Sequence, residues 1–224
     1  ADGKGDLKEL LGGKGAGLAE MTNIGLPVPG GFTITTDACA AYLGKSGKWP
    51  PGMEAQVRKS LAKLEKACGK KLGNRKDPLL VSARSGGALS MPGMMDTILN
   101  IGLNEAVVAG LIERTGNADF VYDIYRRLVQ MFGAVVMGVP DELFEVIITA
   151  RRKKAGVVSD ANLSADDWRA ITLKFKEIYR TYTGADFPTD PYEQLRMATE
   201  AVFRSWNGKR AFDYRNAAHI PHDL

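Results

Sequence analysis

Two glycine-rich segments hold the residues best suited to bind a phosphorylated ligand. In the first, Gly12-Gly13-Lys14-Gly15-Ala16-Gly17 leads into a short helical pattern at 16–21. Phosphate groups need many backbone N–H donors and a few fixed cations, because they carry dense negative charge. Glycines let the backbone approach phosphate oxygens, a helix N-terminus adds a favourable dipole, and Lys14 supplies a point charge. The segment fits neither the Walker A nor the GxGxxG pattern, so a plain turn with an exposed lysine stays open.

The second segment places an arginine where a predicted strand meets a glycine turn. Residues 78–84 read as a buried strand that ends at Arg84, and Ser85 and Gly86 follow directly. A guanidinium fork can bind a phosphate group bidentately, although an ion pair with a local carboxylate is an equal alternative. The loop that follows, Ser90–Thr97, contains three methionines, a proline and a glycine. Its methionines either fill gaps in the core or form a mobile flap over a ligand.

The elements that position these segments change in character near residue 104. Before it, the pattern predicts a strand at 32–35 and helices at 37–43 and 53–69, the first of them capped by Thr36 or Asp37. After it, apolar spacing of i, i+3 and i+4 predicts helices at 105–114, 120–137, 141–154, 165–183, 192–206 and 209–216. We therefore expect an α+β fold, with an α/β subdomain formed by residues 1–104 and about 190–224 and a helical subdomain formed by residues 105–189.

Composition and charge exclude several classes of protein. The 224 residues, 45% of them apolar, suffice for one well-filled core or two small lobes, and no apolar run is long enough to cross a membrane. The formal net charge of +4 is mild, and its densest basic cluster, Arg151–Lys154, follows a helical pattern as a solvated helix end would. Nucleic acid is therefore not an expected partner. Cys39 and Cys68 form no CxxC pair, which favours a reducing compartment: the cytoplasm, or an organelle if a transit peptide has been removed.

The order of these motifs resembles one family of ATP-dependent dikinases. Residues 10–15, 18–21 and 25–32 are similar to the opening of the family that makes phosphoenolpyruvate, which includes pyruvate, phosphate dikinases, phosphoenolpyruvate synthases and glucan water dikinases. Within that family, Val81–Gly86 followed by Ser90–Asn100 resembles the pyruvate, phosphate dikinases more than the phosphoenolpyruvate synthases. Phe203–Trp206 and Tyr125–Arg127 agree with the same group, so the resemblance covers essentially the whole chain.

The resemblance implies a fold, a reaction and a set of ligand-binding residues. The fold would be a partial ATP-grasp, and the ligand ATP, whose pyrophosphoryl group passes to a carrier histidine on another domain that then visits a pyruvate-binding domain. By matching motif, Lys14 and Arg84 would contact the ATP phosphates and neutralise charge as the triphosphate breaks between its α- and β-phosphorus atoms. Arg127 is a weaker candidate for the same cluster. The residues expected near the ligand are Ser85, Gly86, Asp96 and Thr97.

Some parts of the family pattern are missing. The resemblance implies Mg²⁺, but its acidic ligands belong to a later β-rich part of ATP-grasp, and the carrier-histidine motif is also absent. His219 and His222 lack that context, and we expect both at the surface. We therefore expect part of a larger enzyme that turns over no pyruvate by itself, and the resemblance implies that the full-length enzyme is a homodimer. Two alternatives stay open: a sister dikinase with another acceptor, and a silent docking module.

Overall fold

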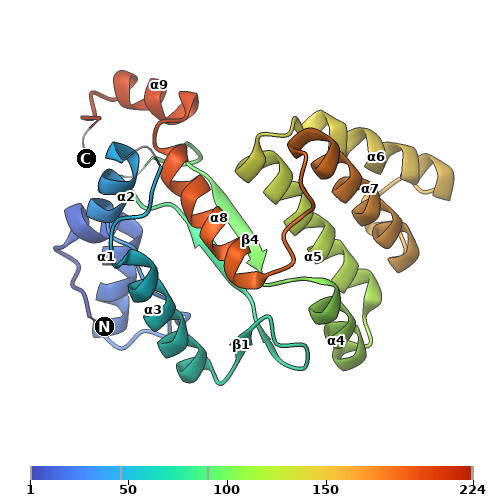
Figure 1. Cartoon of the computed structure of the whole chain (residues 1–224), viewed down its shortest axis with the longest axis horizontal. Coiled ribbons are helices and arrows are strands. Elements are labelled where there is room, and N and C mark those ends of the chain that lie inside the picture. The colour runs from blue at the N-terminus through green and yellow to red at the C-terminus, as the bar shows by residue number, and fades with distance from the viewer. Residues whose placement is uncertain (1, 46, 90, 223–224) are drawn as a thin grey trace. The chain divides into compact units, whose positions relative to one another are not determined.

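The structure is a computed structural model that describes residues 2–45, 47–89 and 91–222. Within these ranges the fold is mostly helical, with two small two-stranded sheets, as an α+β chain requires (Figure 1). The chain forms two compact units: unit 1 from residues 1–69, 84–97 and 199–224, and unit 2 from residues 70–83 and 98–198. The boundaries of these units differ from those of the predicted subdomains, which are residues 1–104 with about 190–224 and residues 105–189. The subdomain assignment stays a prediction.

Helices dominate unit 1. They are α1 (Lys8–Asn23), α2 (Thr36–Gly44), α3 (Met53–Cys68), α9 (Lys209–Ala217) and the end of α8 (Pro191–Ser205). On α3, Val57, Leu61 and Leu64 are buried, at the spacing that places them on one helix face. The helices predicted at 37–43 and 53–69 are confirmed as α2 and α3. The rings of Tyr42 and Phe203 lie 5.2 Å apart and join α2 to the end of α8.

Three sequence-based predictions for unit 1 are wrong. The predicted strand at 32–35 is not a strand. Thr35, and not Thr36 or Asp37 as predicted, caps α2, its side chain accepting a hydrogen bond from the N–H of Ala38. Among the described residues, no strand pairs with residues 32–35, so they form no ladder. The predicted glycine loop is also shorter than expected, because α1 begins at Lys8 and is only kinked at Gly12, where φ is 69°.

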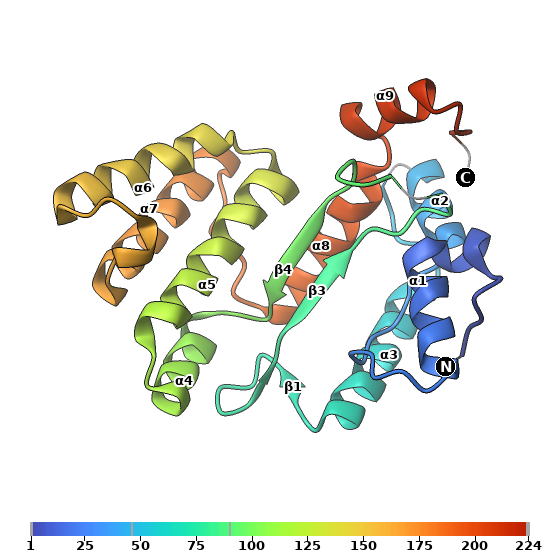
Figure 2. The same cartoon turned by 180° about the vertical axis from the view of Figure 1, so that it is seen from behind.

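Short strands lie beside the helices of unit 2. In the first sheet, β1 (Lys71–Leu72) pairs in parallel with β2 (Pro78–Leu79). In the second, β3 (Val81–Arg84) pairs with β4 (Thr97–Ile101), and Figure 2 shows the two running in opposite directions. The prediction of a single buried strand at 78–84 is thus wrong in two respects. The strand is interrupted at Leu80, and the residues of β3 alternate between half-buried and exposed. This alternation arises because β3 belongs to a thin two-stranded sheet.

The remaining elements of unit 2 confirm the predicted helices. They are α4 (Glu105–Thr115), α5 (Ala118–Met131), α6 (Asp141–Ala155), α7 (Ala165–Thr183) and most of α8. Helix α7 contacts both α5 and α6, as Figure 1 shows. The helix predicted at 120–137 continues beyond Met131 as a π-helix, Phe132–Val136. Phe187 fills the centre of this unit, with its ring within 6.5 Å of the rings of Tyr125, Phe132 and Tyr179.

Among the described residues, no helix has both the length and the apolarity to cross a membrane.

Candidate phosphate-binding site

The two glycine-rich segments meet in unit 1. The N–H of Gly13 donates to the carbonyl oxygen of Gly87 at 2.8 Å. At Gly12, a β-carbon would lie only 1.8 Å from the carbonyl oxygen of Gly86, and the positive φ is itself unfavourable for other residues. This contact, which we call the glycine junction (Gly12–Lys14 against Ser85–Gly87), therefore depends on glycine at position 12.

Lys14 and Arg84 lie at the glycine junction. Lys14 follows the kink in α1, and its Nζ donates to the carbonyl oxygen of Ser85 at 2.8 Å. Burial, and then the positive charge of Arg84, lower the pKa of Lys14 below its usual value. Both residues are exposed, and among the described residues neither forms an ion pair with a carboxylate. The local-carboxylate alternative for Arg84 therefore has no partner in the part of the chain that the structure describes.

The other two predicted residues of the second segment support the junction through their backbone. Ser85 is buried, with 5% of its surface exposed, and its carbonyl oxygen fixes Lys14. The α-carbon side of Gly86 faces Lys14, since a β-carbon on Gly86 would lie 3.6 Å from the Lys14 β-carbon. These contacts leave a surface of glycine backbone with two cations on it, which is suited to an anion with several oxygens.

Asp96 and Thr97, at the end of the methionine-rich loop, have other contacts. The carboxylate of Asp96 accepts a hydrogen bond from Arg210 Nη2 at 3.2 Å. The backbone N–H of Asp96 donates to Ser205 Oγ at 3.4 Å. Burial raises the pKa of Asp96, and the charge of Arg210 opposes that rise. Thr97 is the first residue of β4. In the loop, Met91 is buried, as a packing role predicts, whereas Ser90 lies outside the described residues.

Arg127, the weaker candidate, belongs to unit 2. It lies on α5, and its guanidinium pairs with Asp123 at 2.8 Å, with 57% of the Arg127 side chain exposed. Arg127 thus has a carboxylate partner within its own helix, which it shares with Arg126. Arg127 also lines a groove of about 430 Å³ in unit 2, together with Leu99, Asn100, Ile124, Gln130, Met131, Ala134, Val135 and Asp141.

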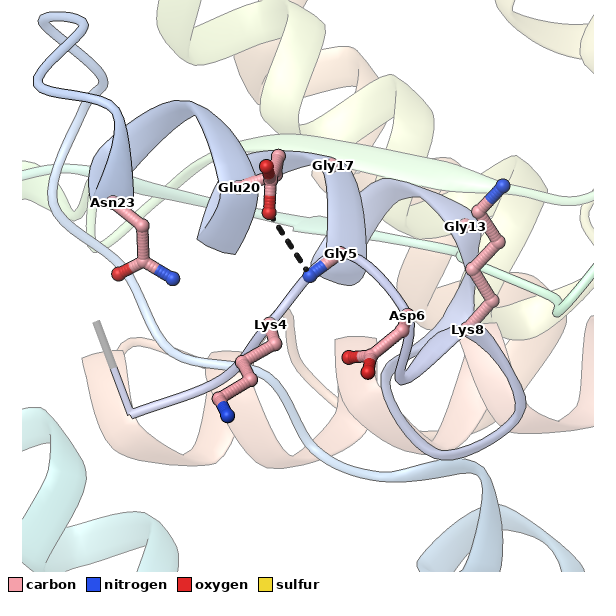
Figure 3. Close-up of a pocket in the computed structure, with 8 residues that line it drawn as sticks. All are labelled: Lys4, Gly5, Asp6, Lys8, Gly13, Gly17, Glu20 and Asn23. Atoms are coloured by element: carbon pink, nitrogen blue, oxygen red, sulfur yellow. Dashed lines mark hydrogen bonds between the residues drawn. The ribbon is translucent and has the colours of Figure 1, made fainter.

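A hollow along α1 is a second feature of unit 1 that sequence patterns did not indicate. It has a volume of about 840 Å³, and neither Lys14 nor Arg84 lines it. Figure 3 shows its lining and the 3.3 Å hydrogen bond from the N–H of Gly5 to the Glu20 carboxylate. The lining residues are Lys4, Gly5, Asp6, Lys8, Gly13, Gly17, Glu20 and Asn23. Its two acidic side chains make it a poorer match for a polyanion than the glycine junction.

The described residues contain no group of three or more histidine, cysteine, aspartate or glutamate side chains that could hold a metal ion. His219 and His222 are both exposed.

A mostly helical α+β chain that carries two cations on a glycine backbone, without a carboxylate partner among the described residues, has the features of a nucleotide-binding domain. The family model described as "Pyruvate phosphate dikinase, AMP/ATP-binding domain" matches residues 8–63 and 45–224. The chain therefore belongs to this family, and the resemblance seen in its motifs is confirmed.

Curated relatives agree with the family match. The chain is 48% identical over 223 residues to the pyruvate, phosphate dikinase of Clostridium symbiosum, covering 99% of this chain and 26% of that protein. It is 49% identical over 219 residues to the enzyme of Entamoeba histolytica, covering 98% and 25%. It is 46% identical over 220 residues to a chloroplastic enzyme of Arabidopsis thaliana, covering 98% and 23%. The chain thus spans about a quarter of the length of these relatives.

Proposed function

We propose that this chain is the ATP-binding part of a pyruvate, phosphate dikinase, and that Lys14 and Arg84 bind the phosphates of ATP. The observation that carries this proposal is the glycine junction, where two neighbouring cations have no carboxylate partner among the described residues. Keeping two like charges close together without an anion is unfavourable, and a bound polyphosphate would remove that cost. The family match supports ATP as the polyphosphate.

The two cations would have different tasks in the reaction. The planar guanidinium of Arg84 can bind two phosphate oxygens at once, whereas the Lys14 ammonium acts as a point charge whose position is set by the Ser85 carbonyl oxygen. In the proposed transfer, a histidine nitrogen attacks the β-phosphorus, the α–β bridging P–O bond breaks, and AMP leaves with the bridging oxygen. The two cations stabilise the charge that develops on these oxygens.

The proposal extends to parts of the enzyme beyond this chain. It assigns residues 1–104 with about 190–224, and residues 105–189, to the α/β and helical parts of an ATP-grasp fold. The carrier histidine and the pyruvate site belong to other domains of the same homodimeric enzyme, in the cytoplasm or in an organelle. Mg²⁺ would be held by those other parts, since the described residues offer no acidic cluster that fits it. Asp96, Thr97 and Arg127 stay in the proposal as residues near the ligand.

Calorimetric titration of the full-length protein with a non-hydrolysable ATP analogue tests the site. Lys14→Ala and Arg84→Ala should each weaken binding roughly 10- to 100-fold, as expected for a hydrogen bond to a charged group worth about 1.5–3 kcal/mol. The matched control is Lys63→Ala, which removes an exposed lysine from α3 of the same unit. Unchanged affinity in both site variants would refute the assignment. Formation of AMP that requires both pyruvate and orthophosphate, and that releases diphosphate, would separate this enzyme from a sister dikinase with another acceptor.

A further inference from the structure

A buried arginine in unit 1 contacts the residues behind the glycine junction. Arg215, on α9, has no exposed surface. Its Nη1 donates to the carbonyl oxygen of Trp206 at 2.6 Å, its Nε donates to His222 Nδ1 at 2.9 Å, and its guanidinium lies 4.1 Å from the centre of the Trp206 ring. Among the described residues, its Nη2 has no hydrogen-bond partner. Burying an arginine without a carboxylate is costly, so this arrangement calls for an explanation.

These contacts fix the position of Trp206 through both its backbone and its indole ring. Trp206 receives the Arg215 hydrogen bond at its carbonyl oxygen, and its Nε1 donates to the carbonyl oxygen of His222 at 3.0 Å. His222 in turn stacks on Phe212, with ring centres 4.6 Å apart, and its Nε2 lies 3.0 Å from Asn216 Oδ1. The indole ring therefore has little freedom to move.

The free edge of the Trp206 ring lies against the glycine junction. A β-carbon on Gly87 would be 3.3 Å from Trp206 Cζ3 and 3.5 Å from the Met95 methyl group. Gly87 is the residue whose carbonyl oxygen accepts from Gly13, next to Lys14. The loop that carries the Lys14 acceptor is thus in contact with α1 on one side and with Trp206 on the other.

We propose that Trp206 and Arg215 are positioning residues that hold the Ser85–Gly87 loop, and through it Lys14 and Arg84, in the geometry that binds ATP. This inference rests on the proposed function. Trp206 contacts no phosphate in it, and acts by limiting the conformations of a glycine-rich loop that would otherwise be flexible. The buried Arg215 fixes the indole in its place.

The test uses the full-length protein and equilibrium binding of a non-hydrolysable ATP analogue. Trp206→Ala should weaken binding about tenfold, and Trp206→Phe, which keeps an aromatic ring, about threefold. Arg215→Met should resemble Trp206→Ala. The matched controls are Trp168→Phe and Arg126→Met, because Arg126 covers the Trp168 ring at 4.5 Å in unit 2 in a similar pair. These controls should leave the affinity within twofold of the original.

A double-mutant cycle separates positioning from general stabilisation. If Trp206 acts through the loop that fixes Lys14, Trp206→Phe should change affinity less than twofold once Lys14 is replaced by alanine. Equal effects of Trp206→Phe in both backgrounds, or an unchanged affinity in Trp206→Ala, would overturn this inference while leaving the phosphate site intact. If Lys14→Ala itself has no effect, the proposed function fails and this inference fails with it. Trp206→Phe keeps the test decisive if the alanine variant does not fold.

Discussion

Cations in unit 2 and cations at the glycine junction of unit 1 have different partners. In unit 2, Asp123 accepts from both Arg126 and Arg127, and Lys176 contacts Glu105 and the hydroxyl of Tyr125. These cations have carboxylate partners, and the contacts of Lys176 join α7 to α4 and α5. At the glycine junction, Lys14 contacts only a carbonyl oxygen among the described residues, next to Arg84. The difference separates charges that serve the fold from charges left available for a ligand.

The largest expected effect comes from closing the space at the junction. In Gly12→Ala, the new β-carbon would meet the Gly86 carbonyl oxygen at a residue with positive φ. Together, overpacking and backbone strain should lower the free energy of unfolding by about 3 kcal/mol and abolish binding of the ATP analogue. Urea unfolding and calorimetry measure the two effects.

Gly17→Ala is the matched control for this change. It lies in the same helix, and a β-carbon there meets no atom within 4 Å. Better helix propensity should raise stability by about 0.5–1 kcal/mol. If both alanine variants behaved alike, the close approach of the two glycine segments would be wrong.

Removing one lysine from each region should change stability in opposite directions. Lys176→Met leaves Glu105 and Tyr125 without their cation and should lower the free energy of unfolding by about 1–2 kcal/mol, since only 20% of the Lys176 side chain is exposed. Lys14→Met removes a partly desolvated cation beside Arg84 and should leave stability unchanged or slightly higher. Urea unfolding of both variants measures this, and a clear loss of stability in Lys14→Met would show that Lys14 serves the fold instead.

The two regions should also differ in how stability depends on pH. The Ser164 side chain, and more weakly Arg151, lower the pKa of Asp167 in the capping box of α7. A carboxyl pKa lower in the folded state gives stability that is present above the unfolded value, about 3.9, and is lost as the pH falls through the folded value. Asp167→Asn should therefore cost about 1 kcal/mol at neutral pH and progressively less in acid.

The effect of Lys14 on stability should change at alkaline pH, at the opposite end of the scale from Asp167. Its pKa is lowered in the folded state, so the cost of keeping it charged is present at neutral pH and is relieved as the pH rises through the folded value toward about 10.4. Unfolding free energies of the original protein and Lys14→Met should converge as the pH approaches 10. A stability advantage of Lys14→Met that grows from pH 7 to pH 10 would contradict the lowered pKa.

The smallest expected effect concerns Arg127. Because Arg127 already has a carboxylate partner in Asp123, Arg127→Ala should weaken binding of the ATP analogue less than Arg84→Ala does, by about threefold or less. Calorimetry under the same conditions measures both. An effect as large as that of Arg84→Ala would place Arg127 among the main phosphate contacts.

Sequence reasoning succeeded where local patterns decide the structure. The helices at 105–115 and 165–183 follow from apolar spacing, and the side chains of Asn104 and Ser164, directly before them, cap their N-termini. It failed where a tertiary contact overrides local preference. The β-rich residues 32–35 form no strand, and Thr35 caps α2. Glycines 13, 15 and 17 favour a loop by residue type, but in unit 1 they are part of helix α1.

The candidate site was only partly predictable for the same reason. Lys14 and Arg84 stood out by residue type, but their proximity depends on a contact between segments about 70 residues apart. Asp96 was expected near the ligand, yet its carboxylate pairs with Arg210, which lies far along the chain. Arg215 gave no signal at all, because an arginine on a short, polar helix reads as a surface residue until the fold shows it to be buried.

The most direct test of the central claim is the preference of the full-length protein for an ATP analogue over AMP, measured by calorimetry. If Lys14 and Arg84 bind the β- and γ-phosphates, Arg84→Ala and Lys14→Ala should each lower the ratio of the two affinities about tenfold or more while affecting AMP itself much less. Lys63→Ala should leave the ratio unchanged. A ratio that stays the same in both site variants would show that the glycine junction does not bind the phosphates of ATP.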